Sequence, residues 1–313
     1  MRTATRNRQQ LRYMDDLRAL LEERALQADS DTLGGYLVTP GEVLGELVKA
    51  EAEVSVVRQI SRVLPPAPMD SETPIPTAEN ALSDAEWISE LTPAVADATT
   101  PFGQRVLHPH PIQKRIRVSK TLLRRQPLGE EWIMQLIADA IATPQELAFL
   151  KGSGAGEPLG VINDPDVPSV TSSVSGNVSG DDVMDWIMPL GARFWPRARV
   201  LTTPAFLRHI LELKDGQGRY LFLPYNGRLV NIPVAFTNAL DSAVDSSGDL
   251  VAGEVGAVVG DFSWYWIQDA EELEILRLVE LYAITNETAF QVTQHTDGVA
   301  VVPSAFRVLK IKS

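Results

Sequence analysis

Residues 61–111 read SRVLPPAPMDSETPIPTAENALSDAEWISELTPAVADATTPFGQRVLHPHP, and this segment governs the interpretation of the whole chain. It holds nine of the 21 prolines but only two aromatic residues, Trp87 and Phe102. Proline lacks a backbone donor and breaks helix interiors, so it is confined to loops, edge strands and extended chain. The segment therefore predicts an extended arm that cannot enclose a core of its own.

The second half of this arm is predicted to be a strand. From Arg105 to Leu123, apolar residues such as Ile116 and Val118 are interleaved with basic ones. We therefore expect two long paired strands with a tip near residues 83–93. Since an isolated two-stranded hairpin is only marginally stable in water, we expect the arm to be ordered only against another surface. This expectation indicates an assembly of several chains.

Charge is sorted along the arm. Seven acidic residues and no Lys or Arg lie between Val63 and Gln104, and seven basic residues and no acidic one lie between Ala98 and Gly129. Opposite charges on paired strands favour pairing by up to about 1 kcal/mol per pair. We therefore favour a basic strand that matches the acidic strand of its own hairpin. The alternative is a phosphate-binding face, but no aromatic stacking residues are interleaved with these basic residues.

The rest of the chain predicts a mixed body. Apolar residues at helical spacing predict a helix over 129–151, with a kink or restart at Pro144. Residues 170–285 predict helices at 181–190 and 205–213 and strands at 229–236 and 256–260, with Thr203 as a helix N-cap. Residues 286–313 predict strands that turn at 296–298.

Composition limits the function classes. The 313 residues contain no cysteine, which excludes disulfides and thiolate chemistry. The net charge of −13 disfavours tight non-specific nucleic-acid binding by the whole chain. No apolar run approaches the roughly 20 residues that span a bilayer, and the basic start lacks the apolar region of a secretory signal. Residues 9–27 predict a short charged helix in an N-terminal arm.

No catalytic, cofactor or metal site is predicted. The chain has no G-x-S-x-G, H-E-x-x-H or Walker sequence, and the glycines from Gly152 follow a helix rather than a strand. His108 and His110 lie on one side of a strand without a third ligand nearby, and His209 fits a packed helix position.

The order of these pieces resembles the major capsid proteins of tailed bacteriophages, which have the Hong Kong 97-type fold. The resemblance covers nearly the whole chain from Leu33. It rests on six weak motifs in the right order around the proline-rich arm, namely residues 34–40, 151–160, 231–236, 259–262, 286–291 and 297–306.

The resemblance implies an α+β fold of five parts. These are an N-terminal arm with the entry to the body (1–60), an extended β-hairpin loop (61–126), a peripheral domain with a long spine helix (127–169), an axial α/β domain (170–285), and return strands of the peripheral domain (286–313).

It also implies a structural protein of the virion rather than an enzyme. Copies are expected to form pentamers and hexamers of an icosahedral shell around double-stranded DNA, assembled in the host cytoplasm without a membrane. A separate scaffold, a portal and a cement protein are the expected partners. The arm is expected to lie across the adjacent subunit, with six contact residues: Trp87, Ile88, Phe102, Arg115, Arg117 and Lys120.

Two departures from the family pattern narrow this expectation. Some members join subunits through a lysine on the extended loop, but no lysine occurs between Lys49 and Lys114. We therefore expect no covalent link. The residues before Gly34 are too few for a fused scaffold.

Two alternatives remain open at this point. One is an encapsulin-like bacterial compartment shell, which shares the fold. The other, of a different class, is a hydrolase that uses Asp/Glu pairs.

Overall fold

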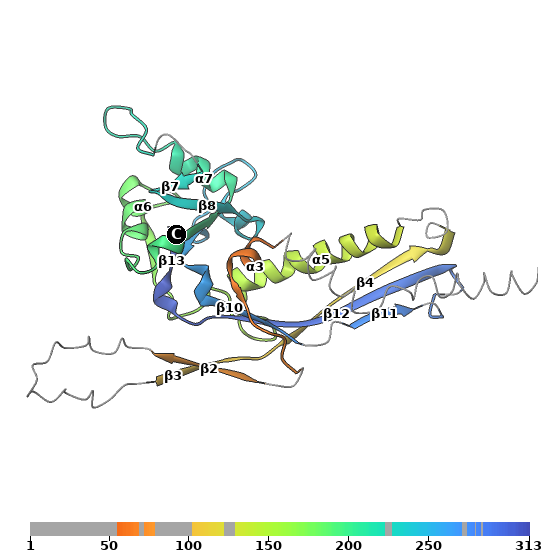
Figure 1. Cartoon of the computed structure of the whole chain (residues 1–313). Coiled ribbons are helices and arrows are strands. Elements are labelled where there is room, and N and C mark those ends of the chain that lie inside the picture. Colours follow the sequence, from red (N-terminus) through yellow and green to blue (C-terminus); the bar gives the residue numbers. More distant parts are fainter. Residues whose placement is uncertain are drawn as a thin grey trace, which may run out of the picture. The chain divides into compact units, whose positions relative to one another are not determined.

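The computed structural model describes residues 55–68, 72–78, 102–121, 129–222, 227–270, 274–278, 280–282 and 284–313. The chain divides into two compact units, Met1–Lys49 and Ala50–Ser313, and all described residues lie in the second. They form sheets of five, six and two strands (Figure 1). The helix expected at 9–27 lies outside the described residues.

The five-stranded sheet is built on one long strand, β12 (Glu287–Ala300). Its neighbours are β10 (Tyr265–Asp269) and β11 (Glu274–Leu278), with β4 (His110–Ser119) also paired to β12 and β1 (Arg62–Val63) paired to β10. Helix α5 (Gly129–Lys151) runs alongside this sheet (Figure 1). The rings of Phe149 and Tyr265 meet edge to face, with their centroids 5.9 Å apart.

The six-stranded sheet has the order β5-β13-β9-β6-β8-β7. Two amphipathic helices accompany it, α6 (Gly180–Ile187) and α7 (Pro204–Leu211). The strands of this sheet are β5 (Ser169–Ser175), β13 (Phe306–Lys312), β9 (Val255–Gly260), β6 (Arg199–Thr202), β8 (Ile232–Phe236) and β7 (Arg228–Leu229). The described 3-10 helices are η1 (Trp195–Arg197), η2 (Asn238–Ala243), η3 (Phe262–Trp264) and η4 (Pro303–Ala305).

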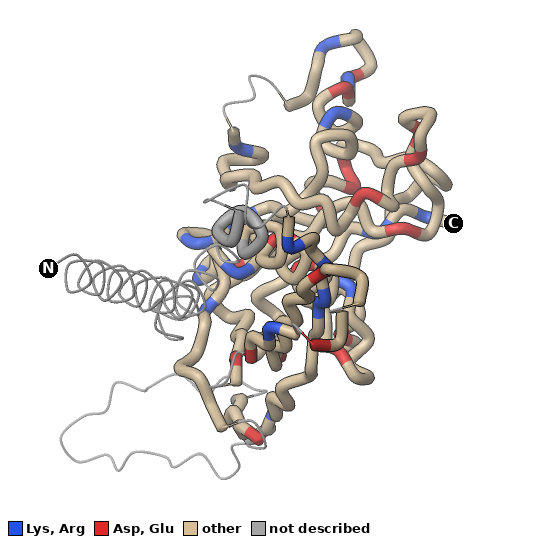
Figure 2. Tube along the Cα trace, turned by 90° about the vertical axis from the view of Figure 1, so that its right-hand side faces the viewer, with Lys and Arg blue, Asp and Glu red and all other residues tan. Residues whose placement is uncertain are grey.

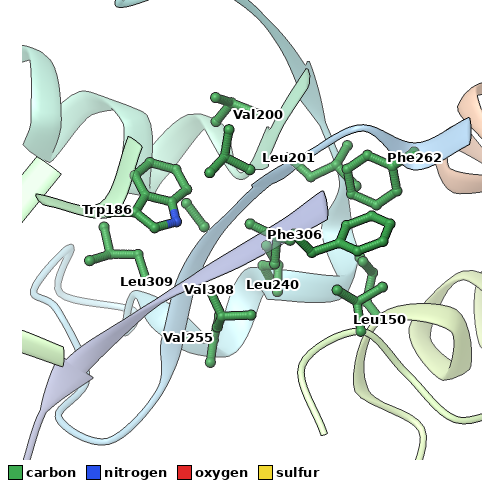
Figure 3. Packing of buried hydrophobic residues seen from close by; sticks show 14 of the residues in the cluster. Leu150, Trp186, Val200, Leu201, Leu240, Val255, Phe262, Phe306, Val308 and Leu309 are labelled. Atoms are coloured by element: carbon green, nitrogen blue, oxygen red, sulfur yellow. The ribbon is translucent and has the colours of Figure 1, made fainter. Parts of the chain in front are cut away.

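The main core is formed by this sheet, its helices and the adjoining residues of α5 and β10 (Figure 3). All six residues of β9 are buried, as expected for a strand covered on both faces. Phe262 and Phe306 pack edge to face at 5.3 Å, and the indole of Trp186 donates to the carbonyl of Arg307 at 2.9 Å. Buried aromatic groups of this kind add to the hydrophobic stabilisation of this part of the chain.

The predicted helix starts are confirmed. Ser179 and Asp182 form a reciprocal capping box at α6, and Thr203 accepts a hydrogen bond from Phe206 N at the start of α7, where Pro204 is the first helical residue. These short polar side chains satisfy amide donors that a helix leaves unpaired at its first turn.

Three local predictions are wrong. The strand expected at 229–236 is instead two strands, β7 and β8, which pair antiparallel across a turn at Val230 and Asn231, where both residues have positive φ. Helix α5 continues through Pro144 without a restart, and the Thr143 hydroxyl donates to Asp139 O at 3.0 Å in the turn before it. Strand β12 runs through residues 296–298 without a turn. Gly298 suits this position because a Cβ there would lie 2.7 Å from the Tyr265 hydroxyl oxygen.

The arm is a ribbon of β2 (Thr73–Ala78) and β3 (Phe102–Leu107), paired antiparallel, which confirms the predicted hairpin at its base. Strand β4 is not its second half, because it pairs along its length with β12. The expected charge match within the hairpin is therefore wrong for β4. The expected tip at 83–93 lies outside the described residues.

The last segment is divided between the two larger sheets. Strand β12 joins the five-stranded sheet and β13 joins the six-stranded one, where it pairs with β5 and β9. Residues 286–313 therefore connect two parts of the chain rather than closing one of them.

Candidate functional site: the base of the arm and the neighbouring sheet

The ribbon has an inner and an outer face because side chains of paired strands alternate between faces. Ile75 and Leu107 are buried, and they pack with Val299 of β12 and with Val301, which follows that strand. Pro74, Pro76 and Gln104 are exposed on the other face. The base of the arm is therefore stabilised by its own chain.

Arg105 adds an ionic contact on the inner face. Its guanidinium donates to the Asp164 carboxylate and, at 2.6 Å, to Asp166 Oδ2. The Asp164 side chain is 1% exposed and that of Arg105 is 17% exposed. A buried carboxylate requires such a partner, since desolvation of an unpaired charge costs several kcal/mol.

A second contact fixes the corner between β3 and β4. The carboxylate of Asp297 accepts hydrogen bonds from the backbone amides of His108 at 2.6 Å and Gly298 at 2.7 Å. Burial raises the pKa of Asp297, while these two hydrogen bonds and the nearby histidines oppose that rise. His108 Nδ1 also lies 3.7 Å from Glu72 Oε1.

The expected basic contact residues lie on or just after β4. Arg115 donates to the neutral side chain of Gln291, with its Nε at 2.9 Å, and Arg117 lies 4.0 Å from Glu287 and over the Tyr282 ring. Lys120 follows the strand and is half-buried. Figure 2 marks the basic and acidic positions along the Cα trace, and every charged position between Arg228 and Arg277 is acidic.

The expected apolar contacts are placed only in part. Phe102 begins β3, whereas Trp87 and Ile88 lie outside the described residues. Arg105, Asp164 and Asp297 were missed, because each is far in sequence from its partner and no local pattern connects them.

A buried polar network connects helix α3 (Val56–Ile60) to α5, to the five-stranded sheet and to Thr237, the residue after β8. Arg58 donates to both carboxylate oxygens of Asp269, at 2.7 and 2.9 Å, and Gln145 donates to Gln294 at 2.9 Å. The carboxylate of Glu146 accepts from Val56 N at 3.1 Å and from the Thr237 hydroxyl. These contacts explain why the polar residues Gln145 and Glu146 are buried on an otherwise apolar face of α5.

Other candidate chemistry finds no support in the described part of the chain. No three His, Asp or Glu residues there are grouped to hold a metal ion. His209 is half-buried on α7, with Nε2 2.7 Å from Gly248 O, as its packed position predicts. No described helix is long and apolar enough to cross a membrane.

Comparison with known proteins gives one family. A model of the phage capsid family matches residues 34–311. Among curated proteins, the search finds no match.

Solved structures share the fold. The capsid of a native GTA particle aligns with a TM-score of 0.69 and 20% identity, covering 83% of this chain and 91% of that one. The chain from Gordonia phage Cozz aligns with a TM-score of 0.60 and 16% identity, covering 83% and 87%. The chain from Mycobacterium phage Adephagia aligns with a TM-score of 0.58 and 14% identity, covering 83% and 90%.

Proposed function

Because this chain belongs to the phage capsid family, whose model matches residues 34–311, we propose that its copies assemble as pentamers and hexamers into an icosahedral shell that encloses the double-stranded DNA of a tailed bacteriophage. The chain is a major capsid protein of the virion and has the Hong Kong 97-type fold. The family match over nearly the whole chain is the observation that carries this function.

The arm makes the contact between neighbours in this proposal. Residues Trp87, Ile88 and Phe102 lie across the adjacent subunit. The ribbon supports this role because its outer face remains exposed in the single chain, while its inner face packs on its own body. A stable interface buries about 1,200–2,000 Å² in total, which an arm and an edge contact together supply.

The basic residues Arg115, Arg117 and Lys120 meet acidic surface of a neighbour. The pairing of β4 with β12 supports this contact. Because of that pairing, Arg115 faces the neutral side chain of Gln291 instead of the acidic strand of its own hairpin. The chain between Val63 and Gln104, with seven acidic residues and no Lys or Arg, has the complementary charge. Charge complementarity of this kind fixes the register of an interface more than its affinity.

The five expected parts remain our assignment of domains: the N-terminal arm (1–60), the extended loop (61–126), the peripheral domain with the spine helix (127–169), the axial domain (170–285) and the return strands (286–313). The strand order refines it, since β4 belongs with the peripheral sheet and β13 with the axial sheet. Strands β12 and β13 thereby connect the two domains.

Membership of the family also leads us to propose where the chain assembles and with which partners. We expect a purely structural protein without catalytic activity, assembled in the host cytoplasm with a separate scaffold, a portal and a cement protein. The family match does not favour the encapsulin-like alternative, and it does not favour a hydrolase.

Negative-stain electron microscopy of the purified chain tests this proposal. We expect closed shells of uniform diameter that contain nucleic acid when isolated from virions. A stable, compact monomer under all assembly conditions, detected by solution scattering, would contradict it. Shells that hold a protein cargo and no nucleic acid would instead restore the compartment alternative.

A further inference from the structure

We propose that Arg105 is a positioning residue for assembly: its contact with Asp164 and Asp166 sets the direction in which the arm leaves the chain, and this direction sets the curvature of the shell. The part about curvature rests on the proposed function. The part about direction concerns the single chain and stands without it.

The register of the ribbon places Arg105 at the end of its anchored face. Ile75 pairs with Arg105, and Thr73 with Leu107, so these side chains share the inner face. The next pair outward on that face is Thr77 with Gly103. Neither of these has a long side chain, so Arg105 and its cross-strand partner Ile75 form the outermost pair of the described ribbon that contacts the body.

The partner of Arg105 is a fixed point. Asp164 lies in a loop joined to the end of α5, where the amides of Val161 and Ile162 donate to Phe149 O at 3.1 Å and Leu150 O at 2.9 Å. At Gly160 a Cβ would lie 2.5 Å from the carbonyl carbon of Leu150, so the loop and the helix are in close backbone contact. The arm is thereby tied to the spine helix.

Two separated contacts define a direction, whereas one defines only a pivot. The corner at His108 is held by Asp297, and Arg105 holds the ribbon three residues further out. Without Arg105, the corner and the apolar patch beneath Ile75 and Leu107 remain, so the ribbon stays attached. The apolar contact of Ile75 is non-directional, so it restricts the angle of the ribbon less than the oriented hydrogen bonds of Arg105 do.

A small change of angle at this base has a large effect further out. Residues 79–101 connect the two strands, and half of that length reaches at most about 41 Å when fully extended. A rotation of about 10° would displace such an extended tip by about 7 Å, by simple geometry on that length. A shift of this size would change which residues of the neighbour the arm meets.

An arginine is suited to this task because its planar guanidinium presents several donors in a fixed arrangement. It engages two different carboxylates, one buried and one 67% exposed. A lysine at this position retains the charge but has no planar fork to orient both carboxylates.

The test compares three variants of the full chain: Arg105→Ala, Arg105→Lys and the matched control Gln104→Ala. Gln104 is the adjacent residue on β3 and is exposed on the opposite face. Hydrogen exchange of the unassembled chain measures the amides of β2 and β3, with the buried strand β9 as the internal reference. Electron microscopy of assembled particles measures the distribution of shell diameters.

We expect Arg105→Ala to increase exchange in β2 and β3 by about tenfold or more while β9 is unchanged, with a smaller increase for Arg105→Lys. Particles of Arg105→Ala should show a broadened or mixed distribution of diameters, or fail to close. Gln104→Ala should match the wild type in both measurements. If Arg105→Ala does not fold, Asp166→Ala removes the exposed half of the contact and should give the same changes at reduced size.

Unchanged exchange in the ribbon of Arg105→Ala would overturn the positioning role. Faster exchange together with shells of wild-type diameter would overturn the link to curvature. If the wild-type chain itself formed no shells, the proposed function would fail, and the exchange experiment would still decide the positioning role.

Discussion

Asp182 is a nine-tenths buried carboxylate whose hydrogen bonds connect a helix start to an edge strand. It accepts from the amide and hydroxyl of Ser179 at the start of α6, and from the amide and hydroxyl of Ser173 on β5. Burial alone would raise the pKa of Asp182, but the hydrogen bonds from both serines outweigh it and lower the pKa below the ordinary value of an aspartate. The ionised form is therefore the one that stabilises the fold.

Replacement of this side chain, Asp182→Ala, should lower the free energy of unfolding by about 2 kcal/mol at neutral pH, since a cap and several charge-assisted hydrogen bonds are lost. The folded-state pKa is depressed, so this stabilisation is present above the ordinary carboxyl pKa and is lost as pH falls through the folded-state value. Urea unfolding of the unassembled chain between pH 7 and pH 3 measures it.

The neighbouring exposed Asp185→Ala is the control and should leave the unfolding midpoint nearly unchanged. A deficit of Asp182→Ala that stays constant down to pH 3 would show that the ionised carboxylate is not the stabilising form.

Helix α5 is the element in which a local sequence rule failed. A proline inside a helix removes one hydrogen bond and crowds the preceding turn, at a cost of about 3 kcal/mol relative to alanine. The helix nevertheless continues through Pro144. The residues that follow, Gln145 and Glu146, make buried contacts with Arg58, Gln294, Val56 and Thr237, and these tertiary contacts outweigh the local preference.

Since the cost of the proline is local, Pro144→Ala should stabilise the unassembled chain. The gain should be about 1–2 kcal/mol, because alanine restores the helical hydrogen bond but also gives the unfolded chain more freedom. Differential scanning calorimetry measures it as a higher melting temperature. An equal or lower melting temperature would mean that the helix accommodates the proline without cost. A second variant, Thr143→Ala, changes an exposed residue and reports whether the Thr143 hydroxyl contributes to that accommodation.

At the scale of the whole molecule, the base of the arm is anchored to its own chain through Ile75, Leu107 and Arg105. Deletion of residues 78–98 should leave a folded chain, because the described residues outside this range form a large cluster of buried side chains among themselves. It should stop particle formation, because the contact across the neighbour is lost. Circular dichroism and electron microscopy check the two halves of this prediction, and shells of normal appearance from the deletion would refute the role of the arm.

The mature shell should be held without covalent links between copies. The chain has no lysine between Lys49 and Lys114 and no cysteine, so the extended loop lacks the groups for such a bond. A denaturing gel of mature particles should show a single band near 34 kDa, the mass of one chain. A ladder of higher bands would contradict this expectation.

Local patterns were enough to predict several elements. Helix α6, the N-cap at Thr203, the buried strand β9 and the hairpin at 73–107 all follow from short-range rules of capping, periodicity and proline placement. The order of those elements, with its family resemblance, also indicated the capsid fold and its function. These features depend on residues close together in the sequence or on their order.

Partners across long sequence distances were decided only by the tertiary structure. The pairing of β4 with β12 brings together residues 168 or more positions apart, and the contact of Arg105 with Asp164 spans 59 positions. An arginine in an extended strand has the same local pattern whether it faces its own hairpin, its own body or a neighbour. Its partner is fixed by how the sheets pack, because charge and hydrogen bonding act between groups that the folded chain brings within a few ångströms.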